Sequence, residues 1–254
     1  SRQNKDGHWA FELEADATIP AEYIFLNHFL DEVDDDVEKK LANYLRSIQE
    51  LHGGWPLYHG GDFNISASVK AYFALKLVGD SVDAPHMVKA RNMILENGGA
   101  ARSNVFTRIT LALFEQVPWR AAPVMRPEAM LLPKWFPFHI DKVSYWSRTV
   151  MVPLFIIAAI KPKAINPRNV DIKEIFVSND KGQMEYMINP TGHWVGDLLL
   201  FGDRVLQKFE HYLPKALERK GIDKALNFIE KRLNGEEGLG GIFPAIANSL
   251  MAFS

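Results

Sequence analysis

From Ala21 onward, apolar residues recur at spacings of three and four, the period of an α-helix. One such stripe contains Tyr23, Leu26, Phe29 and Leu30. By the same pattern we predict helices over 22–30, 36–48, 66–78, 85–96, 103–114, 146–160, 198–213, 221–232 and 243–254. Strand patterns are scarce, and short glycine-rich joints connect several of these segments. The sequence therefore predicts an all-α fold of stacked helical hairpins, either a solenoid or a closed α/α barrel.

Two stretches lack this periodicity. Residues 118–140 are rich in proline, which favours an ordered, extended segment wrapped over the helices. Residues 161–189 are polar and predict a long loop with a short helix near Ile172. Neither stretch has the composition of a flexible linker, so we expect residues 1–254 to form one domain.

Composition excludes several classes of function. Charged residues make up 24% of the chain and sum to a net charge of −2, which argues against a nucleic-acid partner. The absence of cysteine excludes disulfides and thiolate metal sites. Because the chain opens on Ser1 without a signal peptide, we expect the sequence to begin inside a longer protein. The longest uncharged apolar stretch, 150–160, is too short to span a bilayer but could lie in one leaflet.

A turn of the form Gln-x-x-x-Gly-x-Trp occurs twice. The two copies are Gln3, Gly7 and Trp9, and Gln49, Gly53 and Trp55. We expect the glutamine amide to satisfy backbone groups at a helix end while the indole covers them. Each turn would then tie the end of one helix to the start of the next.

This repeated turn is similar to the QW motif of triterpene cyclases, and the chain closely resembles the bacterial squalene–hopene cyclases. Further blocks carry the resemblance: DATIPAEY (16–23), GGWPLY (53–58), VKAYFALK (69–76), NVFTR (104–108), SYWSRT (144–149) and GGIFP (240–244). The resemblance implies an enzyme of two α/α-barrel domains, of which this chain is the inserted one. A third QW turn would fall near 234–241, where the sequence has decayed and Leu239 stands at the tryptophan position.

The same resemblance implies a substrate and a partner. Squalene or a related polyprenoid would be cyclised to hopene or hopanol through cations, without a metal or a redox cofactor. The acid in that family lies in a D-x-D-D motif, which this sequence lacks. We therefore assign no catalytic residue here, expect the isolated chain to be inactive, and expect the missing acid-bearing barrel domain as its partner. A homodimer is a further candidate assembly.

Family resemblance also assigns site residues. The predicted pocket residues are Trp146, Ile242, Phe243, Pro244, Glu22 and Arg108, and the predicted channel residues are Val143 and Met151. Glu22 would stand at the polar end of the pocket with Arg108 as its ion-pair partner. Lys70 stands where some relatives have glutamate, which leaves a polar role at that position open.

The resemblance implies a bacterial cytoplasmic protein that sits monotopically on the inner membrane. Residues 151–160, followed by Lys161 and Lys163, are a candidate docking face, and a buried core helix explains them equally well.

Two alternatives remain open. One is a non-catalytic scaffold or membrane-docking module. The other is a metal-dependent terpene synthase, because Asp31, Glu32 and Asp35 match a loose D-[DE]-x-x-D pattern that holds Mg²⁺. No second metal-binding motif accompanies this run, and a solvated surface explains it better.

Overall fold

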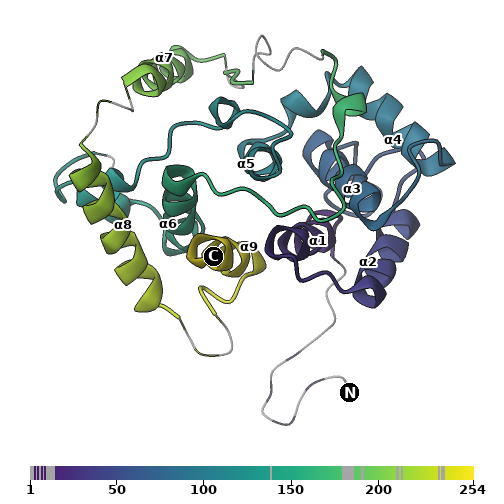
Figure 1. The fold of residues 1–254 in the computed structure, drawn as a ribbon, viewed down its shortest axis with the longest axis horizontal. Coiled ribbons are helices and arrows are strands. Elements are labelled where there is room, and N and C mark those ends of the chain that lie inside the picture. The colour runs from purple at the N-terminus through teal and green to yellow at the C-terminus, as the bar shows by residue number, and fades with distance from the viewer. Residues whose placement is uncertain are drawn as a thin grey trace.

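The computed structural model describes residues 3, 5, 7, 9, 15–137, 139–178, 186–189, 192–209, 212, 214–233, 235 and 238–254. Over these residues the fold is all-α, as predicted, and consistent with an α/α barrel. The helices are α1 (Thr18–Leu30), α2 (Asp35–Ser47), α3 (Ile65–Val78), α4 (Pro85–Glu96), α5 (Val105–Leu113), α6 (Tyr145–Ile160), α7 (Trp194–Phe209), α8 (Lys215–Glu230) and α9 (Phe243–Phe253). Helices α1 to α4 gather on one side and α6, α8 and α9 on the other, and α1 packs against α9 between them (Figure 1).

Side-chain caps set several helix starts. Asp34 accepts hydrogen bonds from two backbone N–H groups at the start of α2, and Asn64 does the same for α3. Ser144 caps α6. These residues precede the first apolar position of each helix, which explains why the predicted boundaries lie close to the observed ones. The predicted end of the helix at 198–213 falls partly outside the described residues, and α7 begins four residues earlier.

Where the structure describes them, the two aperiodic stretches also follow the prediction. Residues 118–137 form extended chain interrupted by the short 3₁₀ turns Trp119–Ala121 and Pro127–Leu131, and a further turn, Ile140–Lys142, follows. In the described part of the loop after α6, residues Lys173–Ile175 form a 3₁₀ turn.

Two hydrophobic clusters form the interior. The larger one contains Trp55, Tyr72 and Phe73, and is built mainly from α1, α3, α4 and α5. The second joins α6, α8 and α9. Val150 and Ala252 pack against both clusters, so α6 and α9 connect the two halves.

Helix α6 corrects the predicted docking face. The side chains of 152–157 are buried, and Val152, Phe155 and Ile156 belong to the second cluster. The apolar run is therefore a core helix, and the interpretation of 151–160 as a membrane-facing surface is wrong. Its apolar character arises because α6 lies between α9 and α8 and is covered on more than one face.

The same side-chain hydrogen bond, from glutamine to glycine, forms within each of the two Gln-x-x-x-Gly-x-Trp turns. Nε2 of Gln49 donates to the Gly53 carbonyl at 2.7 Å, and Nε2 of Gln3 donates to the Gly7 carbonyl at 2.6 Å. Gly53 has a φ of 89°, a conformation that glycine adopts without strain. Gln49 also donates to the carbonyl of His86 in the first turn of α4. The turn after α2 is thus tied to a later helix.

The roles within this turn differ from the prediction in one respect. The indole Nε1 of Trp55 donates to the carbonyl of Leu45 at 2.7 Å, so the tryptophan satisfies the end of α2. A bridge joins Gln3 to Trp9, and a bridge of the same spacing joins Leu233 to Leu239. Leu239 is fully buried in the second cluster, so the decayed third turn still places an apolar side chain in the core.

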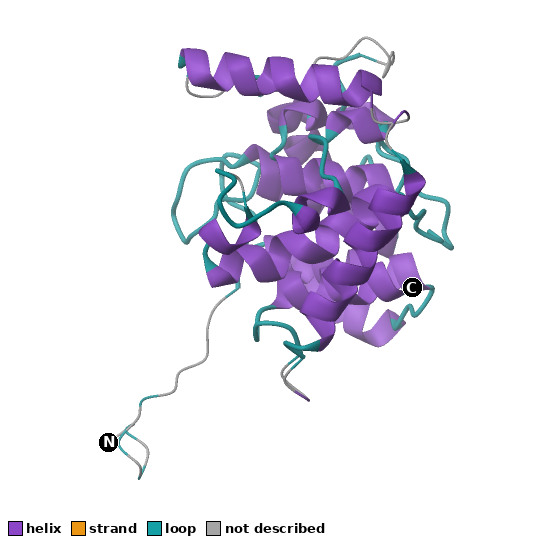
Figure 2. Cartoon of the chain, turned by 90° about the vertical axis from the view of Figure 1, so that its left-hand side faces the viewer, coloured by secondary structure: helices purple, strands orange, loops and turns teal. Residues whose placement is uncertain are grey.

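Helix α7 stands apart from both clusters. It has no buried residue, and it lies across one end of the molecule (Figure 2). Its exposed apolar side chains are Trp194, Val195, Leu198, Leu199, Phe201, Val205, Leu206 and Phe209. Within the described part of the chain, no helix is long and apolar enough to cross a membrane.

The acidic run at 31–36 serves the helix junction. Asp31 ends α1 in the left-handed conformation, and Asp34 caps α2. Asp35 accepts a hydrogen bond from Arg168 at 2.7 Å. Among the described residues there is no group of three His, Asp or Glu side chains placed to hold a metal ion. Local capping by Asp34 and the ion pair of Asp35 with Arg168 therefore account for two of the run's carboxylates, and Asp31 takes part through its backbone.

Candidate functional site

A cavity of about 370 Å³ lies between α1, α3, α5, α6 and α9. The size falls within the range of small-molecule sites, roughly 300–1,000 Å³. Its walls are Thr18, Glu22, Phe25, Leu26, Lys70, Asn104, Phe106, Ile109, Thr110, Leu113, Phe114, Val150, Leu154, Pro244, Ala247, Asn248 and Met251. Helical spacing explains most of this set, since on α1, α5, α6 and α9 lining residues recur every three or four positions. Each of these four helices thus turns one stripe toward the cavity, and α3 contributes Lys70 alone.

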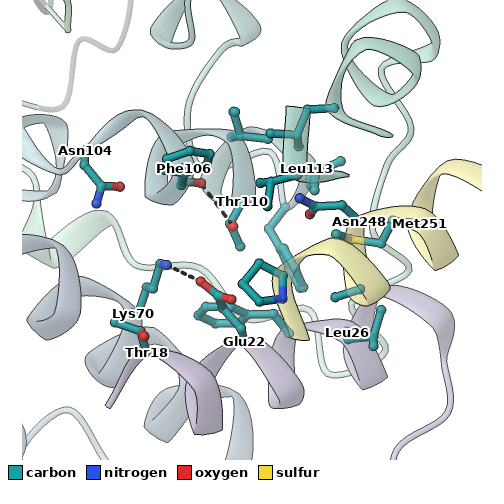
Figure 3. A pocket seen from close by; sticks show the side chains of 17 residues that line it. Thr18, Glu22, Leu26, Lys70, Asn104, Phe106, Thr110, Leu113, Asn248 and Met251 are labelled. Carbon is teal, nitrogen blue, oxygen red and sulfur yellow. Dashed lines mark hydrogen bonds and ion pairs between the residues drawn. The ribbon is translucent and has the colours of Figure 1, made fainter. Parts of the chain in front are cut away.

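Most of the wall is apolar, and polar groups gather at one end. Nζ of Lys70 forms an ion pair with Oε1 of Glu22, although 48 residues separate them. The side chain of Lys70 is 6% exposed and that of Glu22 is 22% exposed. In Figure 3 these two side chains point toward each other, with Thr18 and Asn104 on the same side of the cavity. Pairing allows both charges to remain in a largely apolar surrounding.

Asn104 fixes the helix that forms the opposite wall. Its side chain accepts a hydrogen bond from the backbone N–H of Thr107 at 2.9 Å, and its own N–H donates to Oγ of Ser66 at 2.8 Å. This cap anchors the start of α5 against α3. The anchored helix then turns Phe106 and Thr110 toward the cavity (Figure 3).

Aromatic rings support the wall near α1. The ring centroids of Phe25 and Phe114 lie 5.8 Å apart, and each lies 5.2 Å from that of Phe73. Phe25 and Phe114 line the cavity while Phe73 is fully buried behind them. Such a packed cluster gives a fixed aromatic surface, which can stabilise a cation placed against a ring face.

Arg108 does not pair with Glu22, so that part of the prediction is wrong. It lies two positions after Phe106 on α5, which turns it away from the cavity. Its guanidinium donates to the carbonyl of Tyr186 at 2.5 Å and to Sδ of Met187 at 3.3 Å. Burial lowers the pKa of Arg108. The structure therefore places Arg108 against the loop at 186–187.

The other predicted site residues divide into two groups. Pro244 and Glu22 line the cavity. Phe243 lies beside Pro244, and its ring centroid is 6.2 Å from that of Tyr23 on α1. Trp146 is 56% exposed at the start of α6, one turn before the lining residue Val150.

The rest lie away from the cavity. Ile242 and Met151 pack against the second hydrophobic cluster. Val143 follows the 3₁₀ turn Ile140–Lys142 and is half-buried. The structure does not bring the two predicted channel residues, Val143 and Met151, into the cavity wall, and their channel role stays a prediction.

Several lining residues were not predicted. They include Lys70, Asn104, Thr110 and Asn248. One signal in the sequence points to them: each is a polar position on a mostly apolar helix or at its cap. Asn248, for example, follows Pro244 by four residues on α9 and lies on the same face.

The model of the squalene-hopene cyclase N-terminal domain matches residues 1–254. A squalene–hopene cyclase from Bradyrhizobium diazoefficiens is 55% identical over 99% of this chain and 38% of that protein. One from Zymomonas mobilis is 53% identical, and one from Alicyclobacillus acidocaldarius is 34% identical, each over 99% of the chain. The chain spans less than two fifths of these relatives, since it covers 38% of the second and 39% of the third.

Proposed function

This chain belongs to the squalene–hopene cyclase family, of which it is the N-terminal domain, and we propose that its cavity forms part of the chamber in which squalene or a related polyprenoid is cyclised. The observation that carries the proposal is the arrangement of the residues in the cavity wall. Stripes from four helices, with Lys70 of α3, converge on an apolar cavity that has an ion-paired polar end. The apolar wall would bind the hydrocarbon substrate, and the polar end of the cavity would set which end of the substrate lies there.

The chain's own residues would bind and position the substrate. The cluster of Phe25 and Phe114 offers aromatic faces to the positive charge that develops during cyclisation. Lys70 neutralises the Glu22 carboxylate, so this end can hold a hydroxyl group or a water molecule without a free charge beside the cation.

The initiating acid would come from a partner. Protonating an alkene requires a strong, hydrogen-bonded acid, and the sequence has no D-x-D-D motif. We propose that an acid-bearing second domain closes over the cavity. Exposed aromatic rings support such a cover, because Tyr23 and Phe106 stand at the surface on two of the helices that line the cavity.

A chimera tests this function. The chain would replace the matching 38% of the Bradyrhizobium diazoefficiens cyclase, to which it is 55% identical. We expect the chimera to form hopene from squalene, measured by gas chromatography and mass spectrometry. The isolated chain, assayed in parallel, should form none. A folded chimera without product, or hopene from the isolated chain, would contradict the proposal.

We also propose that α7 docks the protein on a membrane. Its apolar side chains are exposed, while Arg204 and Lys208 lie on another side of the helix. Trp194 begins the helix, and tryptophan prefers the membrane–water interface. An amphipathic helix of this kind lies in the plane of the interface. The alternative function, a non-catalytic membrane-docking module, would also bind membranes through α7. The chimera assay distinguishes the two functions, because a non-catalytic module would give no hopene.

Vesicle co-sedimentation tests the docking. The double substitution Leu198→Ser/Leu206→Ser removes two exposed apolar side chains from α7 and should weaken binding to phosphatidylcholine vesicles roughly tenfold or more. As a matched control, Leu51→Ser/Leu57→Ser removes two exposed leucines from a loop far from α7 in the chain. Equal losses in both variants would count against α7.

A further inference from the structure

A second cavity of about 460 Å³ lies beside α7 and has a different chemistry. Five of its lining residues are basic: Arg120, Arg126, Lys161, Arg204 and Lys208. No aspartate or glutamate is among the described residues that line it. A chain with a net charge of −2 thus gathers five cations around one hollow. Such a hollow attracts anions.

Three carboxylates near this cavity, those of Asp203, Glu128 and Glu218, have identified partners. Asp203 accepts hydrogen bonds from the backbone N–H of Val124 at 2.7 Å and from Nε2 of Gln207 at 2.9 Å. Arg126 pairs with Glu128 at 2.6 Å and with Glu218 at 3.0 Å. The guanidinium carbon of Arg120 lies 5.4 Å from the ring centroid of Tyr186. Besides Arg126, the basic residues come from three segments of the chain that meet here.

One of these segments, α7, connects the cavity to the proposed docking surface. Arg204, Gln207 and Lys208 lie on α7, the helix whose exposed apolar residues include Val205 and Leu206. Lys161 ends α6, and Trp119 and Met125 contribute apolar wall. A molecule in this cavity could place an anionic group among the cations while its apolar part follows α7 toward the bilayer.

We propose that this cavity binds the phosphate headgroup of an anionic phospholipid. Arginine presents several N–H donors that match phosphate oxygens, and two arginines besides Arg126 line the cavity. Basic hollows beside a membrane-facing helix are suited to such headgroups. The proposal rests on the docking of α7 proposed above. The site would hold the protein on anionic membranes more firmly than on neutral ones.

Vesicle composition tests the proposal. Replacing part of the phosphatidylcholine with phosphatidylglycerol should strengthen binding of the protein. Arg204→Gln/Lys208→Gln should lower the gain in vesicle affinity that phosphatidylglycerol gives roughly tenfold, since two cations are removed. Lys39→Gln/Lys40→Gln removes the same charge from α2, on the other side of the molecule, and should keep the gain (Figure 1). Equal losses in both variants would mean that net charge alone acts, and would overturn the proposal.

A titration in solution distinguishes lipid binding in this cavity from membrane docking by α7 and from binding of free phosphate. Isothermal titration would use short-chain phosphatidylglycerol below its micelle concentration and, separately, inorganic phosphate. We expect saturable binding of the lipid that Arg204→Gln/Lys208→Gln weakens and Leu198→Ser/Leu206→Ser largely retains. Binding of phosphate as tight as that of the lipid would overturn the lipid assignment. Absence of lipid binding would overturn the site, whatever the vesicle result for α7.

Discussion

Replacing Trp55 with alanine is expected to lower the free energy of unfolding by about 3–5 kcal/mol. The indole is fully buried in the larger cluster and donates to the carbonyl of Leu45. The backbone N–H of Trp55 also donates to Oγ of Ser68 on α3, so the turn joins α2 to α3. Loss of the ring leaves a cavity and an unsatisfied helix end together. Urea unfolding followed by circular dichroism measures the change.

The first copy of the turn supplies the control. Trp9 has the same place in its Gln-x-x-x-Gly-x-Trp turn but is 58% exposed in this chain. Trp9→Ala should therefore cost less than about 1 kcal/mol. Trp55→Phe should fall between the two, because it keeps most of the ring volume and loses the N–H. Equal losses of unfolding free energy in Trp9→Ala and Trp55→Ala would show that the motif, and not burial of the indole, determines the contribution to stability.

Breaking the ion pair at the polar end of the cavity should have a comparable effect. Glu22→Leu leaves the Lys70 ammonium unpaired in a buried position and should cost about 3–5 kcal/mol. Lys70→Met should cost less, roughly 2–3 kcal/mol, because Glu22 is more exposed to water. The difference between these two variants follows from the difference in burial.

The double variant completes the cycle. Glu22→Leu/Lys70→Met removes both charges and should lie within about 1 kcal/mol of the unsubstituted chain. Urea unfolding of all four proteins gives the coupling energy. Additive losses in the double variant would contradict the pairing of Lys70 with Glu22.

Helical periodicity predicted the fold well because it depends on local spacing. Each of the nine predicted segments overlaps a helix of the described chain, although α7 and α8 begin four and six residues before the predicted starts. Caps such as Asp34 and Asn64 mark helix starts in the sequence. The environment of each apolar face was harder to predict. Both α6 and α7 contain many apolar residues, but neighbouring helices cover α6 and leave α7 exposed. Which face is covered depends on tertiary contacts that periodicity does not contain.

The site was less predictable because its polar pair is non-local. Glu22 was predicted through the family resemblance, but its partner lies on α3 and not on α5. On α5, a position two residues from a lining residue faces the opposite side, which turns Arg108 away from the cavity. Pro244 lines the cavity, although its role as a substrate-pocket residue stays a prediction, and Asn248 on the same face could have been found from spacing.

Filling the cavity tests most directly the claim that this chain forms a wall of the reaction chamber. Thr110 faces the cavity and is half-buried, so Thr110→Phe should occupy part of the space. Asn43→Phe adds the same ring at an exposed position on α2. In the chimera described above, with folding verified by thermal melts, we expect Thr110→Phe to reduce squalene turnover by about tenfold or more, and Asn43→Phe to leave it within about twofold. A folded Thr110→Phe chimera that turns over squalene at the unsubstituted rate would contradict the account.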